Sequence, residues 1–121
     1  MMLKWNEYMT EIQARTAELA RISPEIVRGY RALSDAGQKT NKLEAKTREL
    51  IALAVAVSLR CDGCITIHTS AAIKNGATEE EIVEALGVAV SVNAGATLVY
   101  SGRVLDAFHA KADPDPAAQH G

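Results

Sequence analysis

The feature that most constrains the fold is an apolar run over residues 50–59, interrupted only by Ser58 and preceded by the mostly charged stretch 43–49. Together the two halves predict one helix over residues 43–59. A helix that is apolar on every face is expected to be buried on every face. Glu49 stands at the border of the halves, where a carboxylate either turns to water or is held by a partner.

Signals at helix ends predict the other helices. Ser23 and Pro24 supply a capping hydroxyl and a first-turn proline, and Thr78 with Glu81 forms a capping box. We expect helices to stop at Gly37, Gly76 and Gly95. The expected helices cover residues 3–20, 24–35, 43–59, 61–75, 79–93 and 96–111. The sequence therefore predicts an all-α fold of about six helices.

Composition limits the class of protein. Apolar residues make up 48% of the 121-residue chain but aromatics only 4%, which favours one domain of closely packed helices over residues 1–112. Residues 113–121, with two prolines, are expected to be a flexible C-terminal tail, which makes His120 an idle residue. The net charge of −2 gives no reason to expect nucleic acid or an anionic membrane as a partner.

No segment is expected to direct the chain to a membrane. The N-terminus has no apolar signal-peptide region. The run over residues 50–59 is too short to span a bilayer, and Glu84, Asn93 and two glycines interrupt residues 82–100. We therefore expect a soluble cytoplasmic protein, in which a CxxC motif indicates redox or metal chemistry.

Cys61 and Cys64, the only cysteines, enclose Asp62 and Gly63, and His68 follows Cys64 by one helical turn. This spacing predicts a redox-active dithiol with a base on the same helical face. Thiols at helix N-termini have pKa values lowered to about 3.5–7.5, which applies to both positions. The spacing of His68 favours Cys64 as the attacking thiol and Cys61 as the resolving one, although thioredoxin-type motifs use the reverse order.

A short connection at Arg60 favours an antiparallel pair of helices on either side of it. Folding the chain there places Glu49 opposite about Ala71, within one turn of His68. The expected relay runs from carboxylate to imidazole to thiol, with Glu49 fixing the imidazole tautomer and His68 accepting the thiol proton.

Two other interpretations stay open. Cys61, Cys64 and His68 are three possible zinc ligands, but the sequence has no second Cys/His pair to complete a closed site. Alternatively, the cysteines are buried structural residues and His68 lies on the surface.

Three stretches resemble the carboxymuconolactone decarboxylase-like superfamily, and specifically its alkylhydroperoxidase D-like members. They are Lys46-Thr47-Arg48-Glu49-Leu50, residues 61–68 and residues 72–82. The resemblance implies an all-helical fold with a central helical hairpin that carries the CxxC site. It also implies either thiol peroxidase activity on alkyl hydroperoxides or disulfide reductase activity, with an antioxidant role. The relay that it implies consists of Glu49, Cys61, Cys64 and His68.

The resemblance further implies a redox-active Cys61–Cys64 disulfide in place of a bound cofactor or metal, and a lipoyl or thioredoxin-like dithiol as reductant. There is one departure: the characterised peroxidase of this kind has a histidine just before its second cysteine, where this chain has Gly63. The decarboxylase branch generally lacks the CxxC pair, so lactone decarboxylation is the alternative activity.

A homo-oligomer is also expected. The runs over residues 50–59 and 83–99 supply more apolar helix surface than a domain of this size can bury. Closed symmetry is the usual way to cover such surface. The resemblance favours a homohexamer over a homotrimer.

Overall fold

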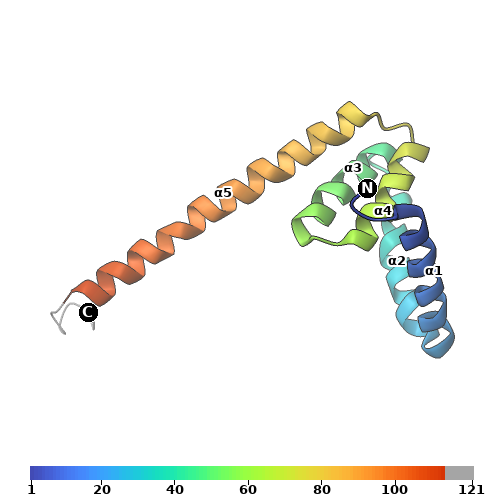
Figure 1. Cartoon of the computed structure of the whole chain (residues 1–121), viewed down its shortest axis with the longest axis horizontal. Helices are drawn as coiled ribbons and strands as arrows, with labels where there is room; N and C mark the ends of the chain where they lie inside the picture. The colour runs from blue at the N-terminus through green and yellow to red at the C-terminus, as the bar shows by residue number, and fades with distance from the viewer. Residues whose placement is uncertain (114–121) are drawn as a thin grey trace. The chain divides into compact units, whose positions relative to one another are not determined.

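The computed structural model describes residues 1–113, and in that range it contains five helices and no strand. The helices are α1 (Trp5–Ile22), α2 (Pro24–Thr40), α3 (Ala45–Leu59), α4 (Asp62–Lys74) and α5 (Glu79–Ala112) (Figure 1). The all-α prediction is confirmed, with five helices in this range in place of about six. His120 and all but the first residue of the expected tail lie outside the described residues.

Two of the expected stops at glycine are wrong. α5 continues through Gly95, which merges the expected helices 79–93 and 96–111 into one. α2 passes Gly37 and ends at Thr40, where Asn41 adopts the left-handed conformation with φ of 49°. A glycine inside a helix costs only about 1 kcal/mol relative to alanine, which does not end a helix whose flanking residues continue the pattern.

Of the two predicted helix starts, the one at Ser23 and Pro24 is confirmed in part and the one at Thr78 in full. Pro24 begins α2 as expected, but the Ser23 hydroxyl makes no capping hydrogen bond. The capping box before α5 is confirmed: the Thr78 backbone N–H donates to Glu81 Oε1 at 2.9 Å, and the Glu81 N–H donates to Thr78 Oγ1 at 3.1 Å.

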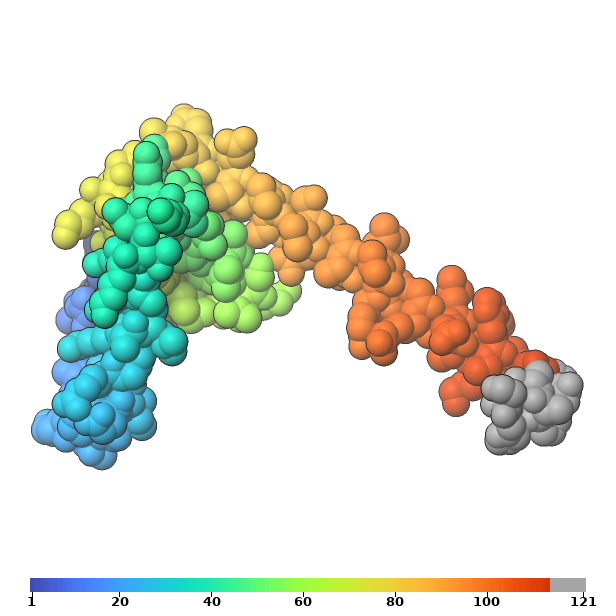
Figure 2. Space-filling model, turned by 180° about the vertical axis from the view of Figure 1, so that it is seen from behind, coloured from blue at the N-terminus to red at the C-terminus, as the bar shows by residue number. Residues whose placement is uncertain are grey.

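The first four helices pack as two connected pairs. α1 packs on α2, α3 packs on α4, and α1 also contacts α4. The space-filling view shows α1 and α2 lying against each other (Figure 2). The buried Thr66 hydroxyl in α4 donates to the Trp5 carbonyl oxygen at 3.3 Å, which links α4 to the start of α1.

Contacts divide the chain into one unit over residues 1–89 and a second that begins at Val90. The boundary falls inside the continuous helix α5 and not in a linker, where domain boundaries are usually found. The expected single domain over residues 1–112 therefore stays a prediction.

Burial within the single chain is limited. Among residues 1–113, the buried apolar residues are Val27, Leu53, Ala56, Ala72 and Ala89. The expectation that residues 50–59 are buried on every face is wrong for the isolated chain, because Ile51, Val55 and Leu59 are 49%, 51% and 71% exposed. Their spacing of four residues places them in one stripe along α3, whereas Leu53 and Ala56 lie in the packed part of the helix.

Helix α5 exposes most of its apolar side chains in the single chain. Leu98 and Val99 are 77% and 80% exposed, and Phe108 is 63% exposed. By length and composition alone, α5 is long and apolar enough to cross a membrane. Those two criteria are weak evidence, since core helices of water-soluble proteins also meet them.

Candidate active site

The two cysteines lie at the start of α4. Cys61 is the residue that caps the helix, Cys64 lies in its first turn, and the two form a disulfide with a Cα–Cα distance of 5.3 Å. The Cys64 backbone N–H donates to the Cys61 sulfur at 3.1 Å. An amide directed at this sulfur would stabilise a thiolate there after reduction of the disulfide.

The turn before α4 owes its shape to Arg60 and not to Gly63. Arg60 has φ of 54° and ends α3 in the left-handed conformation, whereas Gly63 lies within α4. A Cβ atom at Gly63 would lie 3.1 Å from Cδ1 of Ile12 in α1, closer than an ordinary contact, so a larger residue there would require the Ile12 side chain to shift.

Glu49 of α3 and His68 of α4 meet across the hairpin. Glu49 Oε2 lies 2.7 Å from His68 Nδ1, and their side chains are 22% and 28% exposed. A carboxylate accepts this hydrogen bond, so the proton lies on Nδ1, and in this tautomer Nε2 is the acceptor nitrogen. The hairpin register thus brings together the carboxylate and the base that the sequence analysis paired.

The second step of the expected relay, from His68 to a cysteine, differs from the first step, from Glu49 to His68. Cys64 and His68 lie on successive turns of α4, but within the described residues no hydrogen bond joins His68 to either sulfur. A sulfur in a disulfide has no proton to donate. The step from imidazole to thiol therefore belongs to the reduced protein and stays a prediction.

A polar cavity of about 800 Å³ opens beside the Glu49–His68 pair. Its other lining residues include Tyr30, Arg48 and Asn75. Neither cysteine is part of this lining. The paired carboxylate and imidazole therefore face a space large enough for a small organic molecule.

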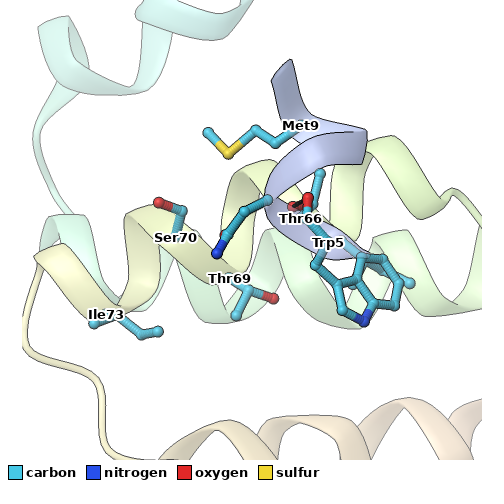
Figure 3. A pocket seen from close by; sticks show the side chains of 8 residues that line it. Trp5, Met9, Thr66, Thr69, Ser70 and Ile73 are labelled. Carbon is cyan, nitrogen blue, oxygen red and sulfur yellow. Dashed lines mark hydrogen bonds between the residues drawn. The ribbon is translucent and has the colours of Figure 1, made fainter. Parts of the chain in front are cut away.

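A separate cavity of about 400 Å³ lies between the start of α1 and α4 (Figure 3). Trp5 and Met9 line it from α1, and Thr66, Ser70 and Ile73 line it from α4. None of the four predicted site residues lines this cavity, which we treat as distinct from the disulfide site.

An ion pair links the beginning of α3 to the beginning of α5. Lys46 Nζ lies 2.8 Å from Glu81 Oε2. The hydrogen bond to Lys46 lowers the pKa of Glu81, and the hydrogen bond to Glu81 raises the pKa of Lys46. Lys46 stands three residues before Glu49 in α3, and its ion pair ties this helix to the capping box of α5.

The arrangement bears on metal binding as well. Within residues 1–113 no three His, Cys, Asp or Glu side chains form a group that could hold a metal ion. The two cysteines considered as zinc ligands are bonded to each other. Their use as ligands would require reduction of this disulfide first.

Sequence reasoning missed three residues around the site. Ile12 of α1 lies against Gly63. Tyr30 lines the Glu49–His68 cavity, and Lys46 pairs with Glu81. No local pattern indicates these contacts, because each joins segments far apart in the sequence.

Comparisons with known proteins place the chain among relatives of similar length. Residues 24–107 match the carboxymuconolactone decarboxylase family. The chain is similar to an uncharacterised protein of Haemophilus influenzae, with 44% identity over 108 residues that cover 89% of this chain and 96% of that protein. Uncharacterised protein 4 in the cox locus of Paracoccus denitrificans is 35% identical over 97 residues, covering 80% and 87% of the two chains.

A solved structure gives the same result for the fold. The crystal structure of apo-lpg0406, a carboxymuconolactone decarboxylase family protein from Legionella pneumophila, is 38% identical and covers 88% of this chain and 95% of its own. The TM-score between the two folds is 0.71. On its sequence, its helical fold and these relatives, the chain belongs to the carboxymuconolactone decarboxylase family.

Proposed function

We propose that the protein is a thiol-dependent peroxidase and disulfide reductase of the alkylhydroperoxidase D type. The observation that carries the proposal is the 2.7 Å contact of Glu49 with His68, one helical turn beyond a disulfide at a helix N-terminus. An oriented base beside a nucleophile is the usual arrangement for activating a thiol. Cytoplasmic antioxidant defence is the role we propose for it.

The proposed reaction uses two electrons from the cysteine pair. His68 accepts the proton of the attacking thiol, which we assign to Cys64, and Glu49 stabilises the imidazolium. The thiolate attacks the terminal oxygen of the hydroperoxide, the O–O bond breaks, and the alkoxide takes a proton and leaves as an alcohol. The resulting sulfenic acid condenses with Cys61, which releases water and forms the disulfide.

A second dithiol must restore the cysteine pair. We propose a lipoyl group or a thioredoxin-like protein, which would reduce the disulfide by thiol–disulfide exchange and become oxidised itself. In the proposed reductase activity, the reduced Cys61–Cys64 pair reduces the disulfide of another molecule by the same thiol–disulfide exchange.

The direct test is consumption of cumene hydroperoxide with dihydrolipoamide as reductant. We expect turnover by the natural chain, none by Cys61→Ser or Cys64→Ser, and unchanged turnover by the control His109→Gln. His109 is exposed near the end of α5 and outside the candidate site. Absence of turnover in a protein shown to carry two free thiols would contradict the peroxidase proposal.

A lyase acting on a lactone acid is the second candidate. One observation favours it: Glu49 and His68 line a polar cavity of about 800 Å³ whose wall does not include the cysteines. A carboxylate–imidazole pair can supply general acid–base chemistry without a thiol. Activity on a lactone acid that survives Cys64→Ser would establish the lyase in place of the peroxidase.

Metal analysis distinguishes zinc binding from the peroxidase and lyase proposals. A zinc protein would retain about one metal ion per chain when purified reduced, and mild oxidation would not lower its mass by two hydrogen atoms. The redox proposal expects no stoichiometric metal and a loss of two hydrogen atoms, as the disulfide forms.

We further propose a homo-oligomer, a homohexamer in preference to a homotrimer. The exposed stripe of Ile51, Val55 and Leu59 and the apolar side chains of α5 support this, since apolar surface on such a scale usually marks an interface. A second copy of the chain is the partner that closed symmetry would supply. Neither nucleic acid nor a membrane is part of the proposal.

A further inference from the structure

A mainly apolar cavity of about 640 Å³ lies between α1, α2 and α4, apart from the polar cavity at Glu49. Its apolar wall includes Ile12 and Leu19 of α1, Ile26 and Val27 of α2, and Ile67 of α4. Ile12 and Leu19 are separated by about 10 Å along the helix axis, at 1.5 Å per residue. The cavity is therefore long enough for an extended aliphatic chain.

This cavity reaches the turn that holds the cysteines. Ile12 lines the cavity, and its Cδ1 atom lies 3.1 Å from the position a Cβ atom would take at Gly63, between Cys61 and Cys64. Ile67, which also lines it, follows Cys64 by three residues and so lies one turn further on the same side of α4. One end of the cavity is thus next to the disulfide.

The apolar cavity also adjoins the polar one. Tyr30 lines both, and the consecutive residues Ile67 and His68 of α4 line one each. A ligand that lies across this boundary would have its reacting polar group at the end near His68 and the cysteines, and its apolar portion towards Leu19. This is the distribution of polarity found in an alkyl hydroperoxide.

Arg31 adds a charge to the wall of the apolar cavity. In residues 1–113 no acidic side chain lies within ion-pair distance of Arg31, whereas Arg15 and Arg28 pair with Glu18 and Glu25. An unpaired guanidinium at an apolar cavity is complementary to the carboxylate of an aliphatic acid.

We propose that the α1–α2–α4 cavity binds the aliphatic chain of a carboxylic-acid hydroperoxide and that Arg31 pairs with its carboxylate. The peroxide half of this ligand rests on the function proposed above. The aliphatic carboxylate half does not, because it depends only on the cavity and on Arg31. Binding of a non-reactive aliphatic acid therefore tests the site whether or not the protein is a peroxidase.

The experiment is calorimetric titration of the oxidised full chain with decanoate, and with decanol as the uncharged chain of the same length. We expect both to bind at one site per chain. Arg31→Gln is expected to weaken decanoate binding by about two- to fivefold, the range of a partly exposed ion pair, without weakening decanol binding. Arg15→Gln is the control, because it removes the same charge from α1 at a residue that does not line the cavity.

Substitutions that fill the cavity test whether its apolar lining binds the aliphatic chain. Thr16→Phe places a ring in the lining, and we expect loss of both ligands; Ala17→Phe, at a second lining position, serves if the first variant loses its helical circular dichroism. Retained decanoate binding in a folded variant would overturn the proposal, as would failure of the natural chain to bind decanoate. Loss of oligomer size with Thr16→Phe would also overturn it, by assigning this surface to contact between copies.

A kinetic comparison completes the test. If the natural chain is a peroxidase, we expect a lower KM for a fatty-acid hydroperoxide than for its methyl ester or for hydrogen peroxide, and Arg31→Gln should remove the difference between acid and ester. Decanoate binding without peroxidase turnover would leave the cavity assignment standing and contradict only the proposed function. Turnover with equal KM values for acid and ester would contradict the role of Arg31.

Discussion

Glu49 and His68, nineteen residues apart in the sequence, place Oε2 and Nδ1 at 2.7 Å across the α3–α4 hairpin. The hydrogen bond fixes the proton on Nδ1 and leaves Nε2 free to accept one. The tautomer of the base is thus set by a residue on a different helix, while the cysteines lie at the start of its own helix.

Removal of either member of this pair is expected to slow peroxide reduction. His68→Ala loses the general base, a contribution of about 10²–10⁴-fold, and Glu49→Gln should cost less, because it removes only the group that orients the base. The loss should be largest at pH values below the thiol pKa and shrink above it, where the thiolate forms unaided. The measurement is kcat/KM against pH, and an equal loss at every pH would indicate a packing role.

The Lys46–Glu81 pair predicts a specific dependence of stability on pH. The pKa of Glu81 is lowered from 4.5, so the pair stabilises the folded chain above that pH and loses this contribution as pH falls through the lower, folded-state value. The pKa of Lys46 is raised from 10.5, so its contribution is complete below 10.5 and is lost as pH rises through the folded-state value.

Glu81→Gln isolates this effect, because glutamine can still accept the hydrogen bond of the capping box. Thermal unfolding should show a lower Tm for Glu81→Gln at pH 7 than for the natural chain, and the difference should shrink as pH falls from 4.5 through the lowered, folded-state pKa of Glu81. The control is Glu80→Gln, an exposed neighbour outside the ion pair. A Tm difference that persists at low pH would assign the effect to capping and not to charge.

Gly63 and Ile12 are expected to be energetically coupled. Gly63→Ala gains up to about 1 kcal/mol of helix propensity but places a Cβ atom 3.1 Å from Ile12 Cδ1. The substitution should therefore be more favourable in the background of Ile12→Ala than in the natural chain, with a coupling of about 0.5–3 kcal/mol in a double-mutant cycle of unfolding free energies. Additive effects within error would show that α1 does not constrain the cysteine turn.

The apolar surface of α5 predicts an assembly larger than one 12.9 kDa chain. Light scattering at micromolar concentration should give a mass near six chains. Val99→Asp places a charge among exposed apolar residues of α5 and should lower that mass, whereas Ala14→Glu on the exposed side of α1 should not. A monomer of the natural chain would contradict the predicted oligomer.

The disulfide-forming spacing, the hairpin and the register of Glu49 with His68 follow from local rules, and for that reason the sequence analysis anticipated them. Helix periodicity places His68 one turn after Cys64, and a short connection at Arg60 leaves little choice for how the two helices pair. The stops expected at Gly37 and Gly95 failed, since glycine only lowers helix propensity and its neighbours decide whether the helix goes on.

What the chain alone determines is therefore local: which segments are helical, where the cysteines lie on their helix and which carboxylate can reach the histidine. Tertiary structure alone decides that Ile12 fills the space beside Gly63, that Lys46 meets Glu81, and that Tyr30 stands between a polar and an apolar cavity. Such contacts join segments that only packing brings together, and packing depends on the shapes of side chains on several helices at once, which no periodicity within one segment encodes.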